Sequence, residues 1–334
     1  MREKQKTRDL AIDLMKGIAI LAVFVGHFAI FSSLHLQRFA FSFHMPLFIM
    51  VGGLFYKPKN VANQICKDAI RLWLPYVVTL LVCVMLSAHT GDGLKLLCGI
   101  YGSVVKSTNT ILQGDVPSVG VLWFLPAMFW CRTFYNSLTK LNLGNAIYTL
   151  VVFVISIGAI YGSKYLILPF GISHGLSMLI FYHIGVNLKY ILNLPFKAVW
   201  FVVALVFWGL SFVFARFSIG EFCYEMLLLN IVGTTGAFYC IYWLSKLLLK
   251  HRFIYPLLWC GQNSMAIYCF HALCFYVIFI VSGQYGEWAP YDPHLVFATH
   301  LVFCLGLTYV LAKLPWIKYI YGIVDFKYEK NSIC

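Results

Sequence analysis

Charged side chains are scarce in this sequence of 334 residues. Asp, Glu, Lys and Arg together make up 11% of the chain, whereas a soluble globular domain carries about 25%. Acidic residues are the rarest of these, with 12 Asp and Glu against 25 Lys and Arg, so the formal net charge is +13. The mean hydropathy of +0.81 excludes a soluble protein and makes nucleic-acid binding a poor explanation of the positive charge. We therefore expect a polytopic membrane protein whose basic residues mark one side of the bilayer.

The sequence also lacks the residue spacings that metal and disulfide sites need. Its 11 cysteines are scattered, mostly inside apolar segments, and none forms a Cys-x-x-Cys pair or a spaced cluster with histidine. We interpret them as small apolar core residues and predict no metal site. No cleavable signal peptide, internal repeat, low-complexity tract or linker is evident. We therefore expect residues 1–334 to form a single transmembrane domain.

Long apolar runs dominate the rest of the chain. A transmembrane helix needs about 20 mostly apolar residues. The predicted fold is all-α, with about ten transmembrane helices at residues 11–33, 38–56, 71–88, 118–138, 145–163, 170–188, 197–217, 221–245, 261–282 and 294–313. The longest interruption, 89–117, is polar at both ends and apolar in the middle. We expect an extracytoplasmic loop or a partly re-entrant helix there.

The basic residues are distributed unevenly between the connections of these segments. If the N-terminal stretch "MREKQKTR" is cytoplasmic, 18 of the 25 Lys and Arg residues fall in cytoplasmic segments and 5 in outer ones. The other two, Lys16 and Arg132, lie within spans. Because short cytoplasmic loops are enriched in Lys and Arg, both termini are predicted to be cytoplasmic.

Three ionisable residues interrupt the first apolar segment, "IDLMKGIAILAVFVGH". A helix turns about 100° per residue, so Asp13, Lys16 and His27 share one face, and Lys16 and His27 are about 16 Å apart along the axis. Ionisable residues inside a span normally face a protein interior or a wet cavity. The structural alternative is an ion pair between Asp13 and Lys16 near the cytoplasmic boundary, with a histidine that packs above it.

A second histidine is expected at the same depth as His27. The next segment, "RFAFSFHMPLFIMVGG", enters from the outer side, which places His44 level with His27 on the antiparallel first helix. Pro46 and the glycines at 52 and 53 should loosen this helix and permit close packing. Two histidines at one depth above a shared polar stripe predict a site rather than two separate packing residues.

Other residues are weaker candidates for the same outer site. Trp123 and Phe124 in "VLWFLPAMFW" suit either an interfacial aromatic belt or a stacking wall for a sugar ring. Glu221 and Glu225 are expected one helical turn apart near the outer surface. For each of these two glutamates alone a packing role is the preferred interpretation, and the same holds for His174, His183, Ser264, Tyr268 and His271.

Several of these segments together resemble a known family. The motifs "DLMKGIAILAVFVGH", "FSFHMPLFIMVGGLF", "RLWLPY", "LWFLPAMFW" and "GQNSMAIYCFH" are similar to those of acyltransferase family 3, integral membrane proteins that transfer acyl groups, most often acetyl, to cell-surface sugars. The branch that the chain resembles most is the fucose 4-O-acetylase-like and enterobacterial-common-antigen O-acetyltransferase-like group. The wider family has an arginine, ten residues and a histidine in the first motif. Lys16 and His27 take these positions here, and lysine lacks the guanidinium fork that binds phosphate bidentately.

The resemblance implies a reaction and a set of site residues. It implies ten transmembrane helices in a bacterial inner membrane, acetyl-CoA that enters from the cytoplasm, and a cell-surface polysaccharide or lipid-linked precursor as acceptor. We expect the general base to be His27, grouped with Asp13 as catalytic. We expect CoA to contact the cations Lys16, Lys67 and Arg71. We expect the acceptor to contact His44, Trp123, Phe124 and Glu225. His44 is also a candidate donor to the oxyanion, and neither a metal nor a nucleic acid is expected.

Three alternatives stay open from the sequence. The donor could be succinyl-CoA rather than acetyl-CoA. The protein could export a modified glycan, although transporters often contain repeats and broken midplane helices, and no repeat is evident. It could also be a sensory or scaffold protein that uses the fold without catalysis, although His27 is present. The acceptor sugar, its hydroxyl and the oligomeric state are left open.

Overall fold

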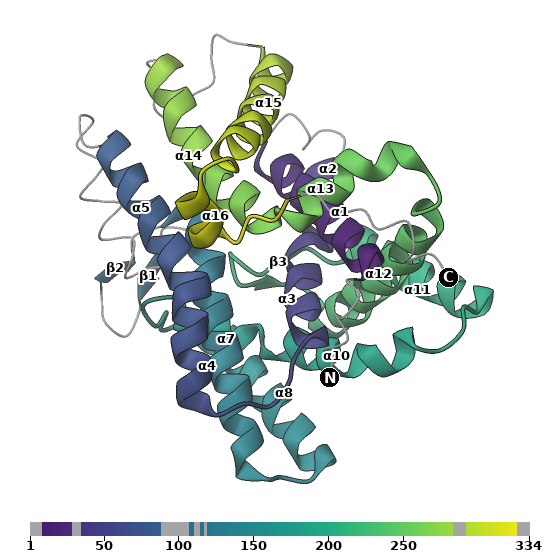
Figure 1. Cartoon of the computed structure of the whole chain (residues 1–334). Helices are drawn as coiled ribbons and strands as arrows, with labels where there is room; N and C mark the ends of the chain where they lie inside the picture. Colours follow the sequence, from purple (N-terminus) through teal and green to yellow (C-terminus); the bar gives the residue numbers. More distant parts are fainter. Residues whose placement is uncertain are drawn as a thin grey trace, which may run out of the picture.

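The structure is a computed structural model that describes residues 9–28, 35–87, 107–109, 114–116, 119–282 and 292–325. Within these ranges the chain is mainly helical, and its strands form two short antiparallel hairpins (Figure 1). The predicted helical class is thus confirmed for the described residues. The basic stretch 1–8, most of the predicted loop 89–117 and the basic residues beyond 325 lie outside them.

The elements follow one another with few long connections. The first half contains α1 (Leu10–His27), α2 (Leu36–Phe41), α3 (His44–Leu54), α4 (Val61–Asp68), a π-helical segment (Ala69–Trp73), α5 (Leu74–Ser87), β1 (Ser107–Asn109), β2 (Gly114–Val116), a 3₁₀ turn (Gly120–Trp123), α7 (Phe124–Leu138) and a 3₁₀ turn (Thr139–Leu141). The second half contains α8 (Asn145–Gly162), α9 (Ile172–Ser177), α10 (Leu179–Leu192), α11 (Ala198–Phe214), β3 (Phe217–Ser218), β4 (Cys223–Tyr224), α12 (Leu227–Leu248), a 3₁₀ turn (Arg252–Ile254), α13 (Tyr255–Gln262), α14 (Ser264–Ser282), α15 (Pro293–Leu311) and α16 (Pro315–Tyr321).

Several helices are long and apolar enough to cross a membrane. Among the described residues there are six, Leu10–His27, Val61–Ser87, Asn145–Gly162, Ile172–Leu192, Leu227–Leu248 and Pro293–Leu311, and two shorter apolar helices, Ala198–Phe214 and Ser264–Ile278. The protein is therefore a multi-pass membrane protein. The number of ten spans and the cytoplasmic location of both termini stay predictions.

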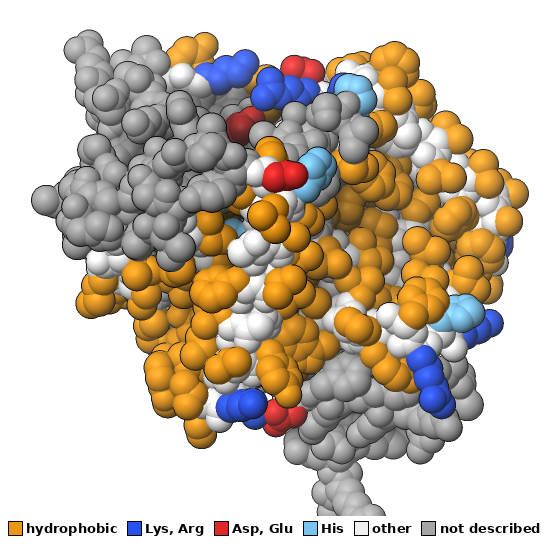
Figure 2. Space-filling view, turned by 90° about the horizontal axis from the view of Figure 1, so that it is seen from above, with side chains coloured by type: hydrophobic (Ala, Val, Ile, Leu, Met, Phe, Trp, Pro, Cys, Tyr) orange, Lys and Arg blue, Asp and Glu red, His pale blue; other side chains and the backbone are white. Residues whose placement is uncertain are grey.

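The outer helices have apolar surfaces that suit contact with lipid. Leu150 and Val154 on α8, and Val199 and Trp200 on α11, are exposed. Figure 2 shows hydrophobic side chains over most of the described surface of one face. Exposed apolar faces of this extent are costly in water and favourable in a bilayer.

By contrast, α1 is enclosed by the other helices. Of its residues 72% are buried, against 17% for α8, and α1 packs against α3, α12, α13 and α14. Gly17 on α1 and Gly261 on α13 allow the two backbones to touch, because a Cβ at either position would overlap the other helix. Gly53 on α3 does the same against α10, which confirms the close packing predicted for this helix.

The predicted second span, 38–56, is not one helix. α2 ends at Phe41 and α3 begins at His44. Pro46 has no N–H to donate to the carbonyl of Ser42, so a regular helix cannot continue through this point. The hydroxyl of Ser42 instead donates to the carbonyl of Phe39 at 2.7 Å and accepts from the indole of Trp208 at 2.9 Å. The break places His44 at the beginning of a helix rather than inside one.

The prediction of a helix from residue 221 was also wrong. Residues 217–224 form the hairpin β3–β4, and α12 begins only at Leu227. The backbone N–H of Glu225 donates to the carbonyl of Arg216 at 3.1 Å, and the backbone N–H of Arg216 donates to the Glu225 carboxylate at 3.1 Å. Glu221 and Glu225 therefore belong to a hairpin between α11 and α12, not to a helical turn.

Candidate active site

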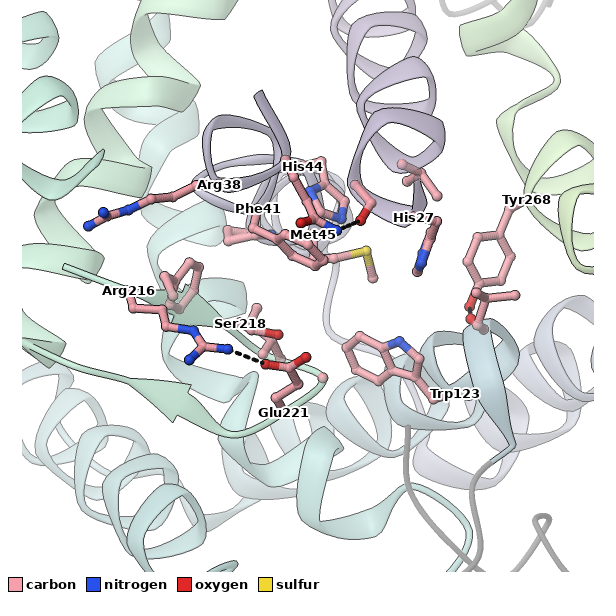
Figure 3. Close-up of a pocket in the computed structure, with 18 of the residues that line it drawn as sticks. His27, Arg38, Phe41, His44, Met45, Trp123, Arg216, Ser218, Glu221 and Tyr268 are labelled. Atoms are coloured by element: carbon pink, nitrogen blue, oxygen red, sulfur yellow. Dashed lines mark hydrogen bonds and ion pairs between the residues drawn. The ribbon is translucent and has the colours of Figure 1, made fainter. Parts of the chain in front are cut away.

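A cavity of about 560 Å³ lies where the C-terminal end of α1 meets the N-terminal end of α3 (Figure 3). His27 is the last residue of α1, and His44 is the first residue of α3. Both histidines line this one space, which we call the histidine cavity. Its other lining residues are Val23, Gly26, Gln37, Arg38, Phe41, Met45, Pro46, Val121, Trp123, Arg216, Phe217, Ser218, Ile219, Gly220, Glu221, Glu225 and Tyr268.

The imidazole of His44 is held in one tautomer by the turn before α3. Its Nδ1 lies 2.5 Å from the carbonyl oxygen of Ala40. Because a carbonyl can only accept, Nδ1 carries the proton when the ring is neutral, and Nε2 keeps a lone pair. The side chain is 2% exposed, and its ring packs against Phe41 with 5.2 Å between centroids. In this tautomer His44 can accept a hydrogen bond from a hydroxyl group.

The ring of His27 is less constrained. It has no hydrogen-bond partner among the described residues, and it is half-buried. Figure 3 shows it pointing into the space between Met45, Trp123 and Tyr268. It lies at the C-terminal end of α1, where the helix dipole favours a positive charge. An imidazole open to a cavity at such a position has the geometry of a general base.

A tyrosine fixes the turn that carries the aromatic wall. The hydroxyl of Tyr268 on α14 donates to the carbonyl of Val121 and accepts from the backbone N–H of Phe124 at 3.3 Å. Between these two residues, Trp123 is 6% exposed and packs against the ring of His174 with 4.9 Å between centroids. Trp123 lies on the histidine cavity, whereas Phe124 turns away from it toward Phe48.

Charges of both signs surround the cavity on the hairpin side. The guanidinium of Arg216 lies 3.6 Å from the Glu221 carboxylate (Figure 3). The guanidinium of Arg38 donates to the carbonyl of Val213 at 3.0 Å. Glu225, a predicted acceptor contact, lines the same rim from the hairpin, and its role stays a prediction. These groups offer donors and acceptors to a polyhydroxyl ligand.

A second cavity, of about 540 Å³, lies at the opposite end of α1. Lys16 lines it from α1, and its ammonium pairs with the Asp13 carboxylate at 2.7 Å. Lys189 from α10 lines the same space, which we call the lysine cavity. Its other lining residues are Asp9, Ile12, Leu54, Phe55, Leu192, Asn193 and Tyr242.

A small apolar void of about 40 Å³ lies along α1 between the levels of these two cavities. Ile20 and Val23 line it from α1, and Met45 and Phe48 line it from α3. Helical geometry places Lys16, Ile20, Val23 and His27 on one face of α1. One face of this helix therefore meets the lysine cavity, the void and the histidine cavity in turn.

A comparison with models of protein families identifies the family of this chain. The model of the acyltransferase domain called Acyl_transf_3 matches residues 9–313. The chain belongs to acyltransferase family 3. The match includes α1, both cavities and the hairpin, so the protein is a membrane acyltransferase. Neither a search of curated proteins nor a search of solved structures finds a match, and the branch within the family stays a prediction.

The acyltransferase does not bring all its predicted donor-site cations together. Lys67 on α4 and Arg71 in the π-helical segment are exposed, and neither lines the lysine cavity. In their region Arg132 Nε lies 2.8 Å from the Asp68 carboxylate, in an ion pair whose aspartate is buried and whose arginine is half-buried. The second cation that lines this cavity beside Lys16 is Lys189, one of the 18 Lys and Arg residues expected on the cytoplasmic side.

Asp13 is also separated from the predicted base. It lies on the same face of α1 as His27 but about 21 Å away along the axis, and it pairs with Lys16 at the lysine cavity. An aspartate at that distance cannot orient the His27 imidazole. The structure thus supports the ion pair between Asp13 and Lys16, and it separates Asp13 from any reaction at His27.

The acyltransferase carries no group of three or more His, Cys, Asp or Glu residues arranged to hold a metal ion within the residues that the structure describes. Its histidine cavity contains polar residues that the sequence did not single out, Gln37, Arg38 and Arg216. Gln37 donates to the carbonyl of Gly26 at 2.8 Å and so ties α2 to the end of α1. In the sequence, the adjacent polar residues Gln37 and Arg38 in "LQRFAF", directly after the first apolar segment, were the feature that could have predicted this.

Proposed function

We propose that this acyltransferase moves an acetyl group from acetyl-CoA, bound at the lysine cavity, to a hydroxyl of a surface glycan or its lipid-linked precursor, bound at the histidine cavity. The observation that carries the proposal is the single face of α1 that lines both cavities. The membrane is the bacterial inner membrane, with the lysine cavity facing the cytoplasm, where acetyl-CoA is made.

The lysine cavity suits a polyanionic donor. Lys16 and Lys189 supply two ammonium groups, and Asn193 adds an amide. Phosphate oxygens accept strong hydrogen bonds from such charged donors. Because Asp13 holds Lys16 at 2.7 Å, the ammonium is positioned before the donor arrives. The volume of about 540 Å³ lies within the range of sites for small ligands.

The space between the cavities suits a thin, flexible group. Lys16 and His27 are about 16 Å apart along α1, which is of the same order as an extended pantetheine arm. The void between them is lined by side chains such as Met45, Phe48 and Met265. Methionine side chains change shape readily, so this region can open for the arm and close around it. The thioester then reaches the level of His27.

The reaction at His27 is a thioester-to-ester transfer. The imidazole takes the proton of the acceptor hydroxyl, and the oxygen attacks the thioester carbonyl carbon. The carbon–sulfur bond breaks as the tetrahedral intermediate collapses. The imidazolium returns the proton to the CoA thiolate, so the products are an acetyl ester and free CoA. His44, whose Nε2 is the acceptor nitrogen in its hydrogen-bonded tautomer, orients the acceptor hydroxyls.

The histidine cavity suits a sugar as acceptor. Sugar rings bind through an apolar face and many hydroxyl groups. Trp123 gives the cavity an aromatic wall, and Glu221, Glu225 and Arg216 give it acceptors and donors along its rim. This combination of one aromatic residue with several polar groups is typical of small-ligand sites.

The proposal is tested with purified protein in nanodiscs. Acetyl-CoA with a labelled acetyl group is supplied together with methyl glycosides of fucose and of N-acetylglucosamine, and ester and free CoA are measured by mass spectrometry. We expect labelled ester in amounts equal to the CoA released. Surface glycans of cells that express the parent protein or an inactive variant give the same readout for larger acceptors. Absence of acetyl-CoA binding would overturn the proposal. Faster transfer from succinyl-CoA would overturn the choice of donor and make succinyl-CoA the donor instead.

A further inference from the structure

Two histidines that the proposed reaction does not use lie directly behind His27. His271 on α14 and His300 on α15 are both 0% exposed. The Nδ1 atom of His271 lies 2.8 Å from the Nε2 atom of His300, within hydrogen-bond distance. The ring of His271 lies 5.4 Å from the ring of His27, centroid to centroid. The three imidazoles therefore form a row that runs from the histidine cavity into the protein.

Aromatic side chains isolate this row from other polar groups. Phe24 lies 4.4 Å from His271 and 5.7 Å from His300, and Phe275 lies 4.7 Å and 4.4 Å from them, centroid to centroid. Burying polar rings in such surroundings is costly unless they are hydrogen-bonded. Among the described residues, Nε2 of His271 and Nδ1 of His300 have no hydrogen-bond partner. The structure shows ring contact but no hydrogen bond between His27 and His271, so Nε2 of His271 is the nitrogen available to form one.

The hydrogen bond between His271 and His300 has two possible directions. If His271 donates from Nδ1, its Nε2 has a lone pair and accepts from an N–H of His27. The other nitrogen of His27 is then unprotonated and can take a proton in the cavity. If His300 donates instead, Nε2 of His271 carries a proton toward His27. His27 would then accept from His271 and could not act as a base.

We infer that His271 and His300 are positioning residues that keep His27 in its basic tautomer, through a row in which His27 donates to His271 and His271 donates to His300. Among the described residues no carboxylate forms a hydrogen bond with His27, and Asp13 lies at the other cavity. When His27 takes the acceptor proton, the row stabilises the imidazolium without moving a proton along it. This inference rests on the proposed function of His27.

Other charged and titratable groups also act on His27. Those that line its cavity from the packed elements are Arg38, His44, Arg216, Glu221, Glu225 and Tyr268. All of them stay unchanged in variants of His271 and His300. A difference in the behaviour of His27 between such a variant and the parent is therefore caused by the change in the row of histidines.

The first test needs no acyl transfer. Diethyl pyrocarbonate acylates unprotonated imidazole, and peptide mass spectrometry reports the extent of reaction at His27 alone across a pH series. We expect His271→Phe to move the midpoint of this profile to lower pH, because the His27 imidazolium loses its hydrogen-bond acceptor. His300→Phe should move the midpoint in the same direction, because His271 is then no longer held in the tautomer that accepts from His27. One hydrogen bond to a charged group corresponds to a shift of about 1 to 2 pH units. His300→Gln, whose amide oxygen still accepts from His271, should keep the midpoint of the parent.

The second test measures acetyl transfer by the same variants. We expect kcat to fall roughly 10- to 150-fold in His300→Phe, the factor for one hydrogen bond to a charged group, with the KM for acetyl-CoA unchanged. His300→Gln should recover most of this loss. Parental midpoints in both phenylalanine variants, or in His300→Phe alone if His271→Phe fails to fold, would overturn the inference. If the variants shift the midpoint but the parent itself transfers no acetyl group, the proposed function is rejected while the row of histidines still holds.

Discussion

The role of each charged side chain in this acyltransferase depends on the groups that it contacts and the cavity that it lines. Lys16 is paired with Asp13 at 2.7 Å and shares its cavity with Lys189, whereas Lys67 and Arg71 are exposed elsewhere. A lysine held by a carboxylate is positioned, and it can still donate its remaining N–H groups to a phosphate. The proposed donor site therefore consists of the cations that line one cavity rather than of all cations on one side of the membrane.

This distinction predicts different effects of four alanine substitutions. Lys16→Ala and Lys189→Ala each remove a charge-assisted hydrogen bond to the donor, worth about 1.5–3 kcal/mol. Their KM for acetyl-CoA should rise roughly 10- to 150-fold, and Lys16→Arg should be tolerated. Lys67→Ala and Arg71→Ala are matched controls and should stay within twofold of the parent. Donor titration by isothermal calorimetry or steady-state kinetics measures all five variants. Equal effects of the cavity and control substitutions would contradict this placement.

At the scale of elements, short irregular segments position the site. The break at residues 42–43, the 3₁₀ turn Gly120–Trp123 and the hairpin β3–β4 all bring side chains to the histidine cavity. Tyr268 ties one of these segments, the 3₁₀ turn, to α14, because the Tyr268 hydroxyl bonds to the backbone at both ends of the turn. The position of Trp123 thus depends on one phenol group from a distant part of the chain.

Tyr268→Phe tests this dependence. The substitution leaves the Val121 carbonyl and the Phe124 N–H without this partner, so we expect a loss of about 1–3 kcal/mol in stability. The kcat/KM for the acceptor should fall, while the KM for acetyl-CoA should not change. Tyr321→Phe is a matched control, because the Tyr321 hydroxyl is buried and lies 3.1 Å from the hydroxyl of Thr79, away from both cavities. Thermal unfolding and acceptor kinetics are measured together, and an equal loss of acceptor efficiency in both variants would reject a positioning role.

The sequence predicted the parts of the site that depend on helical period and depth. The shared face of Lys16 and His27 follows from the geometry of one helix. The meeting of His27 with His44 follows from the antiparallel order of two neighbouring helices. The break before α3 was not predicted, but His44 still lies level with His27 and lines the same cavity.

The parts that depend on non-local packing could not be predicted in this way. Apolar residues run from the hairpin β3–β4 into α12 without a clear boundary. A prediction from hydropathy alone therefore begins the helix too early. The π-helical segment Ala69–Trp73 changes the phase of the residues around Arg71, because each of its turns holds more residues than an α-helical turn. His300 and Lys189 reach their sites through packing of α15 and α10, which no local pattern encodes.

In the whole molecule, the proposed function places the two cavities on opposite sides of the membrane. Two native cysteines report on this. Cys66 on α4 is exposed, and Cys223 on β4 is half-buried, whereas the other described cysteines are buried. We expect a membrane-impermeant thiol reagent to label Cys223 from outside intact cells and Cys66 only in inverted vesicles. Peptide mass spectrometry identifies the labelled sites, and labelling of both from one side would contradict the predicted topology.

We propose that His27 is the base for acyl transfer, and the variant His27→Gln tests whether transfer depends on this base. Glutamine keeps much of the size and hydrogen bonding of histidine but takes no proton at neutral pH. His251→Gln, at an exposed histidine away from both cavities, is the matched control. The measurement is acetyl transfer from acetyl-CoA in nanodiscs, normalised to folded protein and to bound donor. We predict a loss of about 10²- to 10⁴-fold for His27→Gln, with parental transfer for His251→Gln. Transfer by His27→Gln within threefold of the parent would contradict the claim and make His44 the residue to test.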